Sequence, residues 1–421
     1  MSAFLEDLRW RGLIAQTTDE KELAGALEKP VTCYIGFDPT APSIHVGNLV
    51  VLLVLRRFQL AGHIPIALVG GATGLVGDPS GRNEERTLNS SEIVKQWVDR
   101  IAVQVSAVLD FKAKLNPARV VNNLDWTQPL STIEFLRDVG KHFSVNQMLS
   151  KDSVANRLEA GISYTEFSYQ VLQAFDFLEL YRRNQCTLQL GGSDQWGNIV
   201  AGLDLIRRVE GGSAHALTVP LLTKADGTKF GKTAGGSVWL DPEMTSPYAF
   251  FQYWLNSDDS DVINFLKVFS FKSRQEIEEI EKEHQENPGA RNAHRSLARE
   301  LTSLIHGGDT AVRVEEAAKA LFGQGDLSSL DEKTLASALS ELPTVTVTVG
   351  HEIPTWVDLL AAAGVVESKS AARRIIKEGG AYLNNEKIAG EDFRLEKSHF
   401  LCGKYAILRK GKRDLAAVVF E

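Results

Sequence analysis

Short apolar runs rich in β-branched residues alternate with helical patterns in the first part of the chain. Residues 31–37 and 64–70 are two such runs, and each ends in glycine or turn-forming residues. Residues 49–60, which lie between them, have the apolar pattern of a buried helix. Because strands and helices that alternate in this way form parallel sheets, we expect an α/β unit here. A further run at 187–190 and a helical pattern at 199–208 predict that the sheet continues.

Helical patterns occupy most of the remaining chain. Residues 91–109 and 132–158 lie between the two parts of the predicted sheet, so we expect them to form an insertion. Residues 246–322 have a helical pattern throughout, with acidic and basic faces. The alternating segment 344–349 is either an edge strand or a linker. After it, two short helices and a strand within residues 355–384 predict a compact α+β module.

The composition excludes several classes of protein. Of the 421 residues, 43% are hydrophobic and 24% are charged, as is usual for a globular protein. No run approaches the roughly 18 to 20 apolar residues of a membrane span, and the N-terminus lacks the basic and apolar regions of a signal peptide. Cys33, Cys186 and Cys402 are far apart, which argues against a disulfide framework or a zinc site. We therefore expect a cytoplasmic protein with no membrane segment and no dedicated metal site.

The net charge of −8 is unevenly distributed along the chain. Residues 351–421 are the only region with a net positive charge. A surface that binds the phosphates of a nucleic acid is therefore expected in this region. A slightly basic, solvated surface explains the same charge count equally well.

The strongest local signal is the segment 36–48, Gly-Phe-Asp-Pro-Thr-Ala-Pro-Ser-Ile-His-Val-Gly-Asn. A predicted strand leads into a turn-rich loop, and a helix is expected to begin near His45. Ligands of parallel sheets bind at the carboxyl ends of the strands, where helix N-termini offer N–H groups to phosphates. His45 and Asn48 lie on one face of the first turn, and Gly47 lets a base or a phosphate approach the backbone. The alternative is a polar helix cap with an incidental histidine.

A second signal is the segment 229–233, Lys-Phe-Gly-Lys-Thr. Lys229 and Lys232 are three residues apart, and such a loop can close on a triphosphate and stabilise charge on the leaving pyrophosphate. Taken alone, the segment is better explained as a lysine-rich surface loop. The phosphate-site interpretation becomes much stronger in combination with the His45 segment.

A third signal is a stripe of polar residues on a helix that is otherwise apolar. Ser163 and Glu166 form a predicted capping box at its start. Tyr169, Gln173 and Asp176 are spaced by four and three residues, which places them on one side of the helix. Buried groups of this kind need partners, because each one left unpaired costs about 1–3 kcal/mol. They form either an internal polar network or a pocket for a zwitterionic substrate that carries a hydroxyl group.

Taken together, these motifs resemble those of one family. The segments 36–48 and 229–233, with Gly-Gly-Ser-Asp-Gln-Trp-Gly at 191–197, are similar to motifs of class I aminoacyl-tRNA synthetases. More specifically, they resemble the bacterial tyrosyl-tRNA synthetases. The similarity includes residues 67–79 and 135–146, so it covers essentially the whole chain. Several long motifs in the order of the family argue against coincidence.

The resemblance implies an ATP site, with Mg²⁺ bound to ATP as part of the substrate complex. It assigns the phosphates to His45, Thr40, Asn48, Lys229 and Lys232, and contact with pyrophosphate to Arg82 and Arg86. It assigns further contacts with ATP to Gly36, Asp38, Gly47, Gly192 and Asp194. Two positions depart from the family pattern. Asn48 replaces the usual second histidine, so it keeps a hydrogen-bond donor without charge, and Arg82 stands where lysine is common.

The resemblance also implies a site for tyrosine. Tyr34 and Asp176 would hold the substrate phenol, and Gln195 would contact its carboxyl region. The ammonium group is assigned to Asp78, Tyr169 and Gln173. The expected reaction has two steps, namely activation of tyrosine by ATP and transfer to the terminal ribose of tRNA. Two alternatives stay open, a tryptophan-activating relative and a non-catalytic RNA-binding protein on the same scaffold.

The family is homodimeric, and one tRNA commonly bridges both subunits. Residues 135–148 are a candidate interface, although core packing explains their apolar character equally well. The C-terminal segment resembles a small RNA-binding module of a ribosomal protein. Its candidate tRNA contacts are Arg373, Arg374, Lys377, Arg409, Lys410, Lys412 and Arg413.

The predicted fold class is α/β, with a Rossmann-like parallel-sheet catalytic domain that contains a helical insertion. An α-helical domain and a small α+β RNA-binding module follow it. The expected boundaries are 1–225 for the catalytic domain with its insertion and candidate dimer interface at about 91–185, 226–325 for the mobile lysine loop and the helical tRNA-binding domain, 326–350 for a linker, and 351–421 for the module.

Overall fold

The computed structural model describes the chain outside residues 1, 81–88, 151–153, 155–160, 229, 234–235, 349–353, 389 and 412–413, and only the backbone of residues 232 and 233. The described chain divides into two compact units. The first unit contains Met1–Met244 and Asp258–Ala293, and the second contains Thr245–Ser257 and His294–Glu421. Among the described residues, the structure has no helix with the length and hydropathy that crossing a membrane requires.

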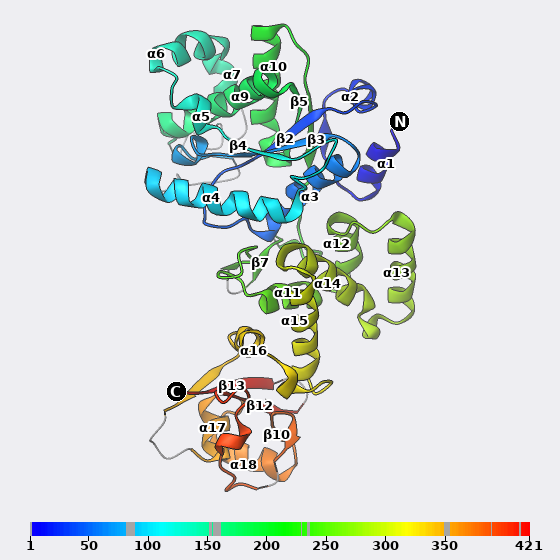
Figure 1. The fold of residues 1–421 in the computed structure, drawn as a ribbon, viewed down its shortest axis with the longest axis vertical. Coiled ribbons are helices and arrows are strands. Elements are labelled where there is room, and N and C mark those ends of the chain that lie inside the picture. The colour runs from blue at the N-terminus through cyan, green and yellow to red at the C-terminus, as the bar shows by residue number, and fades with distance from the viewer. Residues whose placement is uncertain are drawn as a thin grey trace. The chain divides into compact units, whose positions relative to one another are not determined.

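The first unit is built on a six-stranded sheet with the order β1-β6-β5-β2-β3-β4. The neighbours from β6 to β4 pair in parallel, and β1 pairs antiparallel with β6 at the edge. The strands are almost continuously apolar because helices cover both faces of the sheet (Figure 1). Their bounds are β1 Gln16–Thr17, β2 Thr32–Phe37, β3 Ile64–Val69, β4 Arg119–Asn122, β5 Cys186–Gly192 and β6 His215–Val219.

Two pairs of helices cover this sheet. Helices α3 (Val46–Leu60) and α4 (Ser91–Val108) pack on one face, and α9 (Tyr164–Asn184) and α10 (Trp196–Glu210) pack on the other (Figure 1). Strand β2 has β3 on one side and β5 on the other, so the direction of the chain connections reverses beside β2. Such a switch point opens a crevice at the carboxyl ends of the strands, where α/β proteins bind their ligands.

The structure confirms most of the elements predicted for this unit. Strands β2, β3 and β5 and helices α3, α4 and α10 form within a few residues of their predicted bounds. The segment 132–158 differs, because it breaks into several short helices. Phe135–Val139 forms a single π-helical turn there, which changes the spacing of side chains from that of an α-helix. The short pieces are α6 (Thr132–Glu134), the π-turn, a 3₁₀ turn (Gly140–His142) and α7 (Val145–Leu149).

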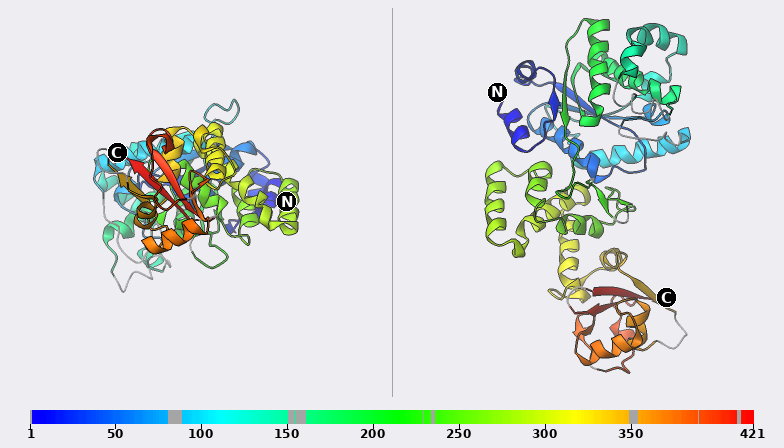
Figure 2. Two further views of the ribbon diagram at one scale, coloured as in Figure 1. Left: turned by 90° about the horizontal axis from the view of Figure 1, so that it is seen from below. Right: turned by 180° about the vertical axis from the view of Figure 1, so that it is seen from behind.

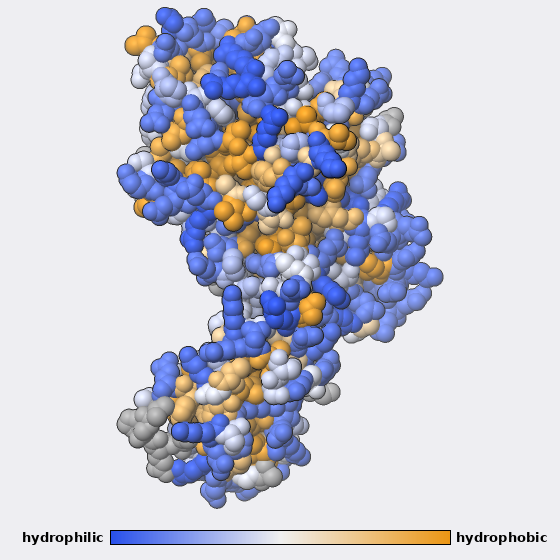
Figure 3. Space-filling model, viewed as in Figure 1, coloured by the Kyte–Doolittle hydropathy of each residue, from blue (hydrophilic) through white to orange (hydrophobic). Residues whose placement is uncertain are grey.

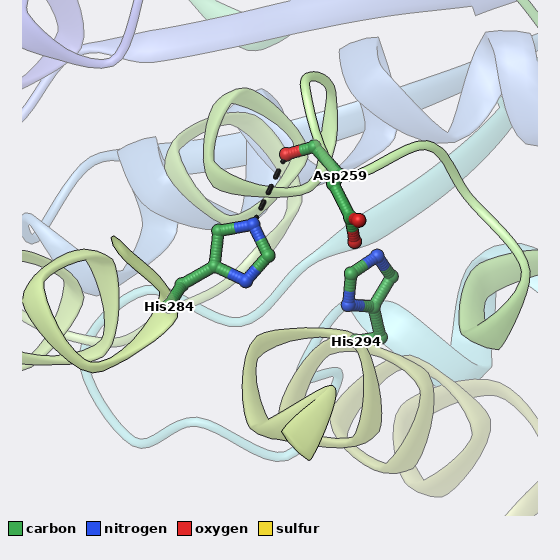
Figure 4. Close-up of side chains that lie close together, drawn as sticks. All are labelled: Asp259, His284 and His294. Carbon is green, nitrogen blue, oxygen red and sulfur yellow. Dashed lines mark hydrogen bonds between the residues drawn. The ribbon is translucent and has the colours of Figure 1, made fainter. Parts of the chain in front are cut away.

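The first unit also contains two helices that follow the sheet. Helix α12 (Val262–Phe269) is largely buried, whereas α13 (Arg274–Glu286) buries only Ile277. A ring nitrogen of His284 near the end of α13 lies 3.2 Å from the backbone carbonyl of Asp259, which ties α13 to the segment before α12 (Figure 4). Figure 3 shows the apolar side chains that lie among polar ones on one face of this unit.

The second unit combines helices with a five-stranded sheet. Its helices include α11 (Pro247–Leu255), α15 (Gly308–Leu321) and α16 (Glu332–Leu339), which contact one another. The sheet has the order β11-β10-β12-β13-β9, and its bounds are β9 Thr344–Val347, β10 Ala381–Leu383, β11 Glu386–Lys387, β12 Tyr405–Lys410 and β13 Asp414–Phe420. Helices α17 (Trp356–Ala362) and α18 (Lys369–Lys377) cover one face of it (Figure 2).

The helical pattern of residues 246–322 is confirmed by α11, α12, α13, α14 (Asn292–His306) and α15. The alternating segment after α16 is an edge strand, because β9 pairs in parallel with β13 at one side of the sheet. Asn385 joins the module to the helices of this unit, since its side-chain amide donates to the carbonyl of Ala320 at the end of α15 over 2.6 Å.

Candidate active site

His45 is the N-cap of α3, at the carboxyl end of β2. Its Nδ1 accepts a hydrogen bond from the N–H of Gly47 over 3.0 Å, so the proton of the neutral ring is on Nε2. A side chain at Gly47 would place its Cβ 2.8 Å from the His45 ring, and glycine is therefore required for this geometry. Asn48 is exposed on the same turn. The turn thus carries an imidazole and an exposed amide at the carboxyl end of β2.

The backbone N–H groups of this turn are already bonded within the protein. The N–H of Val46 donates to the carbonyl of Val238 over 2.9 Å, and those of Asn48 and Leu49 donate to the carbonyl of His45. The expected binding of a phosphate by free N–H groups is therefore not supported by the geometry. A phosphate at this position would instead be held by side chains, and the exposed side chains are those of Asn48 and Thr40.

We call residues 229–233 the lysine segment. Its Gly231 lies against the first turn of α3. Gly231 has a φ of +84°, and a Cβ at this position would lie 3.3 Å from the nitrogen of Gly47. The Gly231 carbonyl accepts from Val238, which in turn accepts from Val46. The structure therefore brings Gly231 of the second motif next to Gly47 of the first. Lys229 and the side chain of Lys232 lie outside the described part, as do Arg82 and Arg86.

A buried chain of hydrogen bonds connects the carboxyl end of β2 with helix α9. The Tyr169 hydroxyl and the Thr73 hydroxyl each donate to Asp38 over 2.6 Å. The side-chain amide of Asn123 donates to Thr73 over 3.0 Å and to Asp176 over 2.9 Å. This chain links Tyr169 and Asp176, two members of the predicted polar stripe, through Thr73 and Asn123. Thr73 begins a 3₁₀ turn (Thr73–Leu75) and Asn123 directly precedes helix α5 (Leu124–Thr127). Because both are distant in sequence from α9, the helical pattern contained no signal for them.

Asp176 is the most deeply buried carboxylate of the site. It is 3% exposed, and the indole Nε1 of Trp126 donates to its second oxygen over 2.8 Å. Burial raises the pKa of Asp176 to about 7, while the hydrogen bonds from Asn123 and Trp126 act in the opposite direction. Both donors hold the carboxylate in one orientation.

Three buried polar atoms on the elements around Asp176 have no hydrogen-bond partner among the residues that the structure describes. They are the hydroxyl of Tyr34, the Oε1 of Gln189 and the Oε1 of Gln173. Tyr34 on β2 and Gln189 on β5 are paired neighbours, and the Tyr34 ring packs on Phe177 of α9 with 5.2 Å between ring centroids. Such atoms cost about 1–3 kcal/mol each when unpaired, so each is a candidate to bind a polar group of a ligand. Gln189 was not predicted from the sequence.

Two further acidic groups lie beside Tyr169. Burial raises the pKa of the Tyr169 hydroxyl, and the charges of Asp38 and Asp78 raise it further. Asp78 accepts from the side chain of Gln195 over 2.7 Å and from the N–H of Ser80 over 2.9 Å. The predicted residues Asp78, Tyr169 and Gln195 are therefore brought together, in surroundings that favour a cationic group.

The end of β5 forms the other side of the crevice. A Cβ on Gly192 would lie 2.6 Å from a carboxylate oxygen of Asp194. Any residue other than glycine would therefore displace this carboxylate. Burial and the charge of Asp78 raise the pKa of Asp194. Gly36, which is exposed on β2, lies in the neighbouring strand.

Two family models match the chain, and together they cover most of it. Residues 26–323 match the class I tRNA synthetases of the W and Y type. The chain belongs to this family. Residues 334–418 match the SYY-like C-terminal domain of tyrosine--tRNA ligases. The synthetase is an aminoacyl-tRNA ligase, and its fold is that of class I enzymes.

Individual relatives agree with this assignment. The synthetase is 61% identical to a tyrosine--tRNA ligase from Streptomyces avermitilis over 99% of each chain. It is 57% identical to a tyrosine--tRNA ligase from Thermobifida fusca over the full length of both. Among solved structures, it is similar to a C-terminally truncated mitochondrial tyrosyl-tRNA synthetase from Aspergillus nidulans, with 32% identity and a TM-score of 0.70. That similarity covers 76% of this chain and 95% of the other.

The candidate tRNA contacts of the synthetase differ in their surroundings. Arg373 and Lys377 on α18 both pair with Glu391, at 3.6 and 3.3 Å. Arg374 on the same helix is exposed, and Lys410 pairs with Asp414. Lys412 and Arg413 lie outside the described residues.

Arg409 is placed differently from these cations. It is 9% exposed, its guanidinium lies 4.1 Å from the centre of the Tyr382 ring, and it donates to the carbonyl of Gly411 over 2.8 Å. Its guanidinium thus packs on strand β10, and its hydrogen bond is to the turn that follows β12.

Proposed function

We propose that this synthetase is a tyrosine--tRNA ligase. It joins tyrosine to ATP to form tyrosyl-adenylate and pyrophosphate, and then transfers the tyrosyl group to the terminal ribose of tRNA(Tyr). The observation that carries the choice of tyrosine is the buried Tyr34 hydroxyl, which has no hydrogen-bond partner in the described part of the chain and lies in the field of Asp176.

A substrate phenol matches this pair of groups. A phenolic hydroxyl donates one hydrogen bond and accepts others. It can donate to the carboxylate of Asp176 and accept from the hydroxyl of Tyr34, so both buried groups are satisfied. Phenylalanine offers neither bond, and the indole of tryptophan is a donor only, which leaves the hydrogen of the Tyr34 hydroxyl unpaired. A site built to bind a hydroxyl strongly rejects analogues that lack it.

The ammonium group of the substrate is assigned to the acidic end of the pocket. Asp78 and Tyr169 approach this position, and the unpartnered Oε1 of Gln173 is a further acceptor. Gln195, which is held by Asp78 and Asn198, would contact the carboxyl region. This arrangement places the substrate carboxylate toward the crevice at the carboxyl ends of the strands.

ATP is assigned to that crevice, with Mg²⁺ as part of the substrate complex. The substrate carboxylate attacks the α-phosphate, the bond to the leaving pyrophosphate breaks, and no covalent enzyme intermediate is needed. Catalysis then comes from positioning and from stabilisation of charge in the transition state. The proposed contacts are His45, Thr40, Asn48, Lys229 and Lys232 with the phosphates, Arg82 and Arg86 with pyrophosphate, and Gly36, Asp38, Gly47, Gly192 and Asp194 with the remaining parts of ATP.

We further propose that the synthetase is a cytoplasmic homodimer and that one tRNA contacts both subunits. Support for an interface comes from exposed apolar side chains next to and within residues 135–148. Ile133, Leu136 and Val145 are 71%, 48% and 58% exposed. Burial of such side chains against a second copy would remove them from water. The exposed cations of the C-terminal module are the proposed contacts with the tRNA backbone.

The test is amino-acid-dependent exchange of pyrophosphate into ATP, measured with tyrosine, phenylalanine and tryptophan. Exchange with tyrosine alone is expected. Exchange with tryptophan but not tyrosine would overturn the choice of substrate, and no exchange with any of the three would favour an RNA-binding protein without catalysis. The Asp176→Ala variant should lose tyrosine-dependent exchange, and normal exchange with normal rejection of phenylalanine in that variant would place the pocket elsewhere.

A further inference from the structure

Two buried arginines converge on the C-terminal end of α12. Arg57, on α3, is 6% exposed and donates to the carbonyls of Val268 and Ser270. Arg11, at the end of α1 (Ala3–Trp10), is 4% exposed and donates to the carbonyls of Lys267, Ser270 and Lys272. The last carbonyls of a helix carry partial negative charge, and buried guanidinium groups that bind them hold the helix end firmly. Helix α12 is thereby attached to α3, the helix that begins at His45.

Helix α12 also contacts the lysine segment, through Phe230. Phe230 is 8% exposed, and its ring lies 5.1 Å from that of Phe265 and 5.2 Å from that of Phe269, both on α12. Aromatic pairs at such distances have preferred orientations and contribute beyond the apolar area that they bury. The residue directly after Phe230 is Gly231, whose backbone packs on Gly47.

These contacts form a closed path through the first unit. It runs from His45 along α3 to Arg57, then to α12, then to Phe230 and Gly231, and returns to the first turn of α3. Two contacts in this path are buried: the hydrogen bonds of Arg57 to the end of α12, and the packing of Phe230 on α12. Buried contacts of this kind tolerate little displacement. The separation between His45 and the segment 231–233 is therefore determined by α12 as well as by the direct contact at Gly231.

We propose that Phe230 and Arg57 are positioning residues for the phosphate chemistry. Phe230 anchors the lysine segment on α12, and Arg57 fixes α12 relative to His45. Neither side chain touches the reacting atoms. The inference rests on the proposed function, in which His45 and the lysine segment act on the phosphates of the same ATP. Stabilisation of a transition state requires donors placed within a fraction of an ångström, so loosening either anchor should slow chemistry more than it weakens tyrosine binding.

The test uses four variants of the full-length protein. Phe230→Leu keeps an apolar side chain but loses the ring contacts. Arg57→Lys keeps the positive charge but loses the paired hydrogen bonds to the two carbonyls. Phe4→Leu is the matched control for the first, because Phe4 packs on Phe58 and His63 of the α3 region with 4.8 Å to Phe58. Arg56→Lys is the control for the second, because Arg56 bonds to Gln59 on its own helix.

The first readout is the rate constant for adenylate formation at saturating ATP, compared with the dissociation constant of tyrosine measured without ATP. Phe230→Leu and Arg57→Lys are expected to lower the rate constant at least tenfold and to leave the dissociation constant within about twofold. The control variants should leave both unchanged. Equal rate losses in the test and control variants, or parallel losses of rate and tyrosine affinity, would overturn the proposal.

The second readout does not depend on activity. Hydrogen exchange of the Val238 amide, which bonds to the Gly231 carbonyl over 3.2 Å, should be faster in Phe230→Leu while amides of α9 keep their rates. Unchanged exchange at Val238 would overturn the anchoring role of Phe230. If the unmodified protein shows no tyrosine-dependent exchange of pyrophosphate, the proposed function fails, whereas this readout still decides whether Phe230 anchors the segment.

Discussion

The indole Nε1 of Trp126 donates a 2.8 Å hydrogen bond to Oδ1 of Asp176, a carboxylate that is almost completely buried. Asn123 holds the other oxygen, so both oxygens have fixed directions before any substrate binds. Burial of a carboxylate is costly unless donors compensate it. Trp126 and Asn123 therefore determine where the carboxylate of Asp176 points, although neither was recognised from the sequence.

Trp126→Phe should weaken tyrosine binding without changing the use of ATP. The variant keeps an aromatic ring but removes the donor, and a hydrogen bond to a charged group contributes about 1.5–3 kcal/mol. We therefore expect kcat/KM for tyrosine to fall by roughly 10- to 100-fold in pyrophosphate exchange. The KM for ATP serves as the internal control. A variant with unchanged kcat/KM for tyrosine would show that Asp176 does not depend on this donor.

The raised pKa of Asp176 predicts a pH dependence near neutrality. Its pKa is about 7 in the folded protein and near 3.8 when exposed, so the folded state holds the proton more tightly. The contribution of this group to stability is therefore greatest below about pH 4 and is lost as the pH rises to 7. The substrate phenol needs the ionised acceptor, so kcat/KM for tyrosine should rise with pH and level off above about 7. The same profile in Asp176→Asn would assign the titration to another group.

Tyr34→Phe separates a ligand-binding role of the hydroxyl from a structural one. The Tyr34 hydroxyl is buried and has no hydrogen-bond partner among the residues described, so its removal should leave the melting temperature of the ligand-free protein unchanged or raise it. At the same time, the preference for tyrosine over phenylalanine should fall at least tenfold in pyrophosphate exchange. A lower melting temperature with unchanged preference would mean that the hydroxyl serves the fold rather than the substrate.

Elements with strong local patterns could be predicted from the sequence. Helix α3 has an apolar pattern along its length, and Ser163 caps α9 through the N–H of Glu166 as its spacing indicates. Strands β1 and β4 were missed, because they have two and four residues and their hydrogen bonds come from neighbours distant in sequence. The π-turn at Phe135–Val139 also has no local signature.

From spacing alone, the candidate site was predictable only where its residues lie on one element, whereas Tyr34, Asp78 and Gln195 were assigned by the family resemblance. Tyr169 and Asp176 share a helix, and their spacing placed them on one side of it. Thr73, Asn123 and Trp126 complete the same site from short segments that meet α9 only in the folded chain. The turn at His45 shows the same limit. Its sequence pattern suggested free N–H groups, but the N–H of Val46 donates a hydrogen bond to the carbonyl of Val238, which is distant in sequence.

Gly47→Ala should slow adenylate formation without harming the fold. Alanine is favoured over glycine in helices by about 0.5–1 kcal/mol, so the melting temperature should stay the same or rise. Its Cβ would lie 2.8 Å from Cε1 and 2.9 Å from Nδ1 of His45, and the imidazole must therefore turn away and lose its bond to residue 47. A displacement of about 1 Å in a catalytic group can lower the rate about 100-fold, and we expect a loss of this order in single-turnover measurements. Gly25→Ala is the matched control, because it lies in the helix Glu20–Ala26 with no atom within 4 Å of the added Cβ, and it should keep the full rate. If Gly47→Ala also keeps the full rate, the orientation of His45 seen in the structure is not the one that acts on the phosphates.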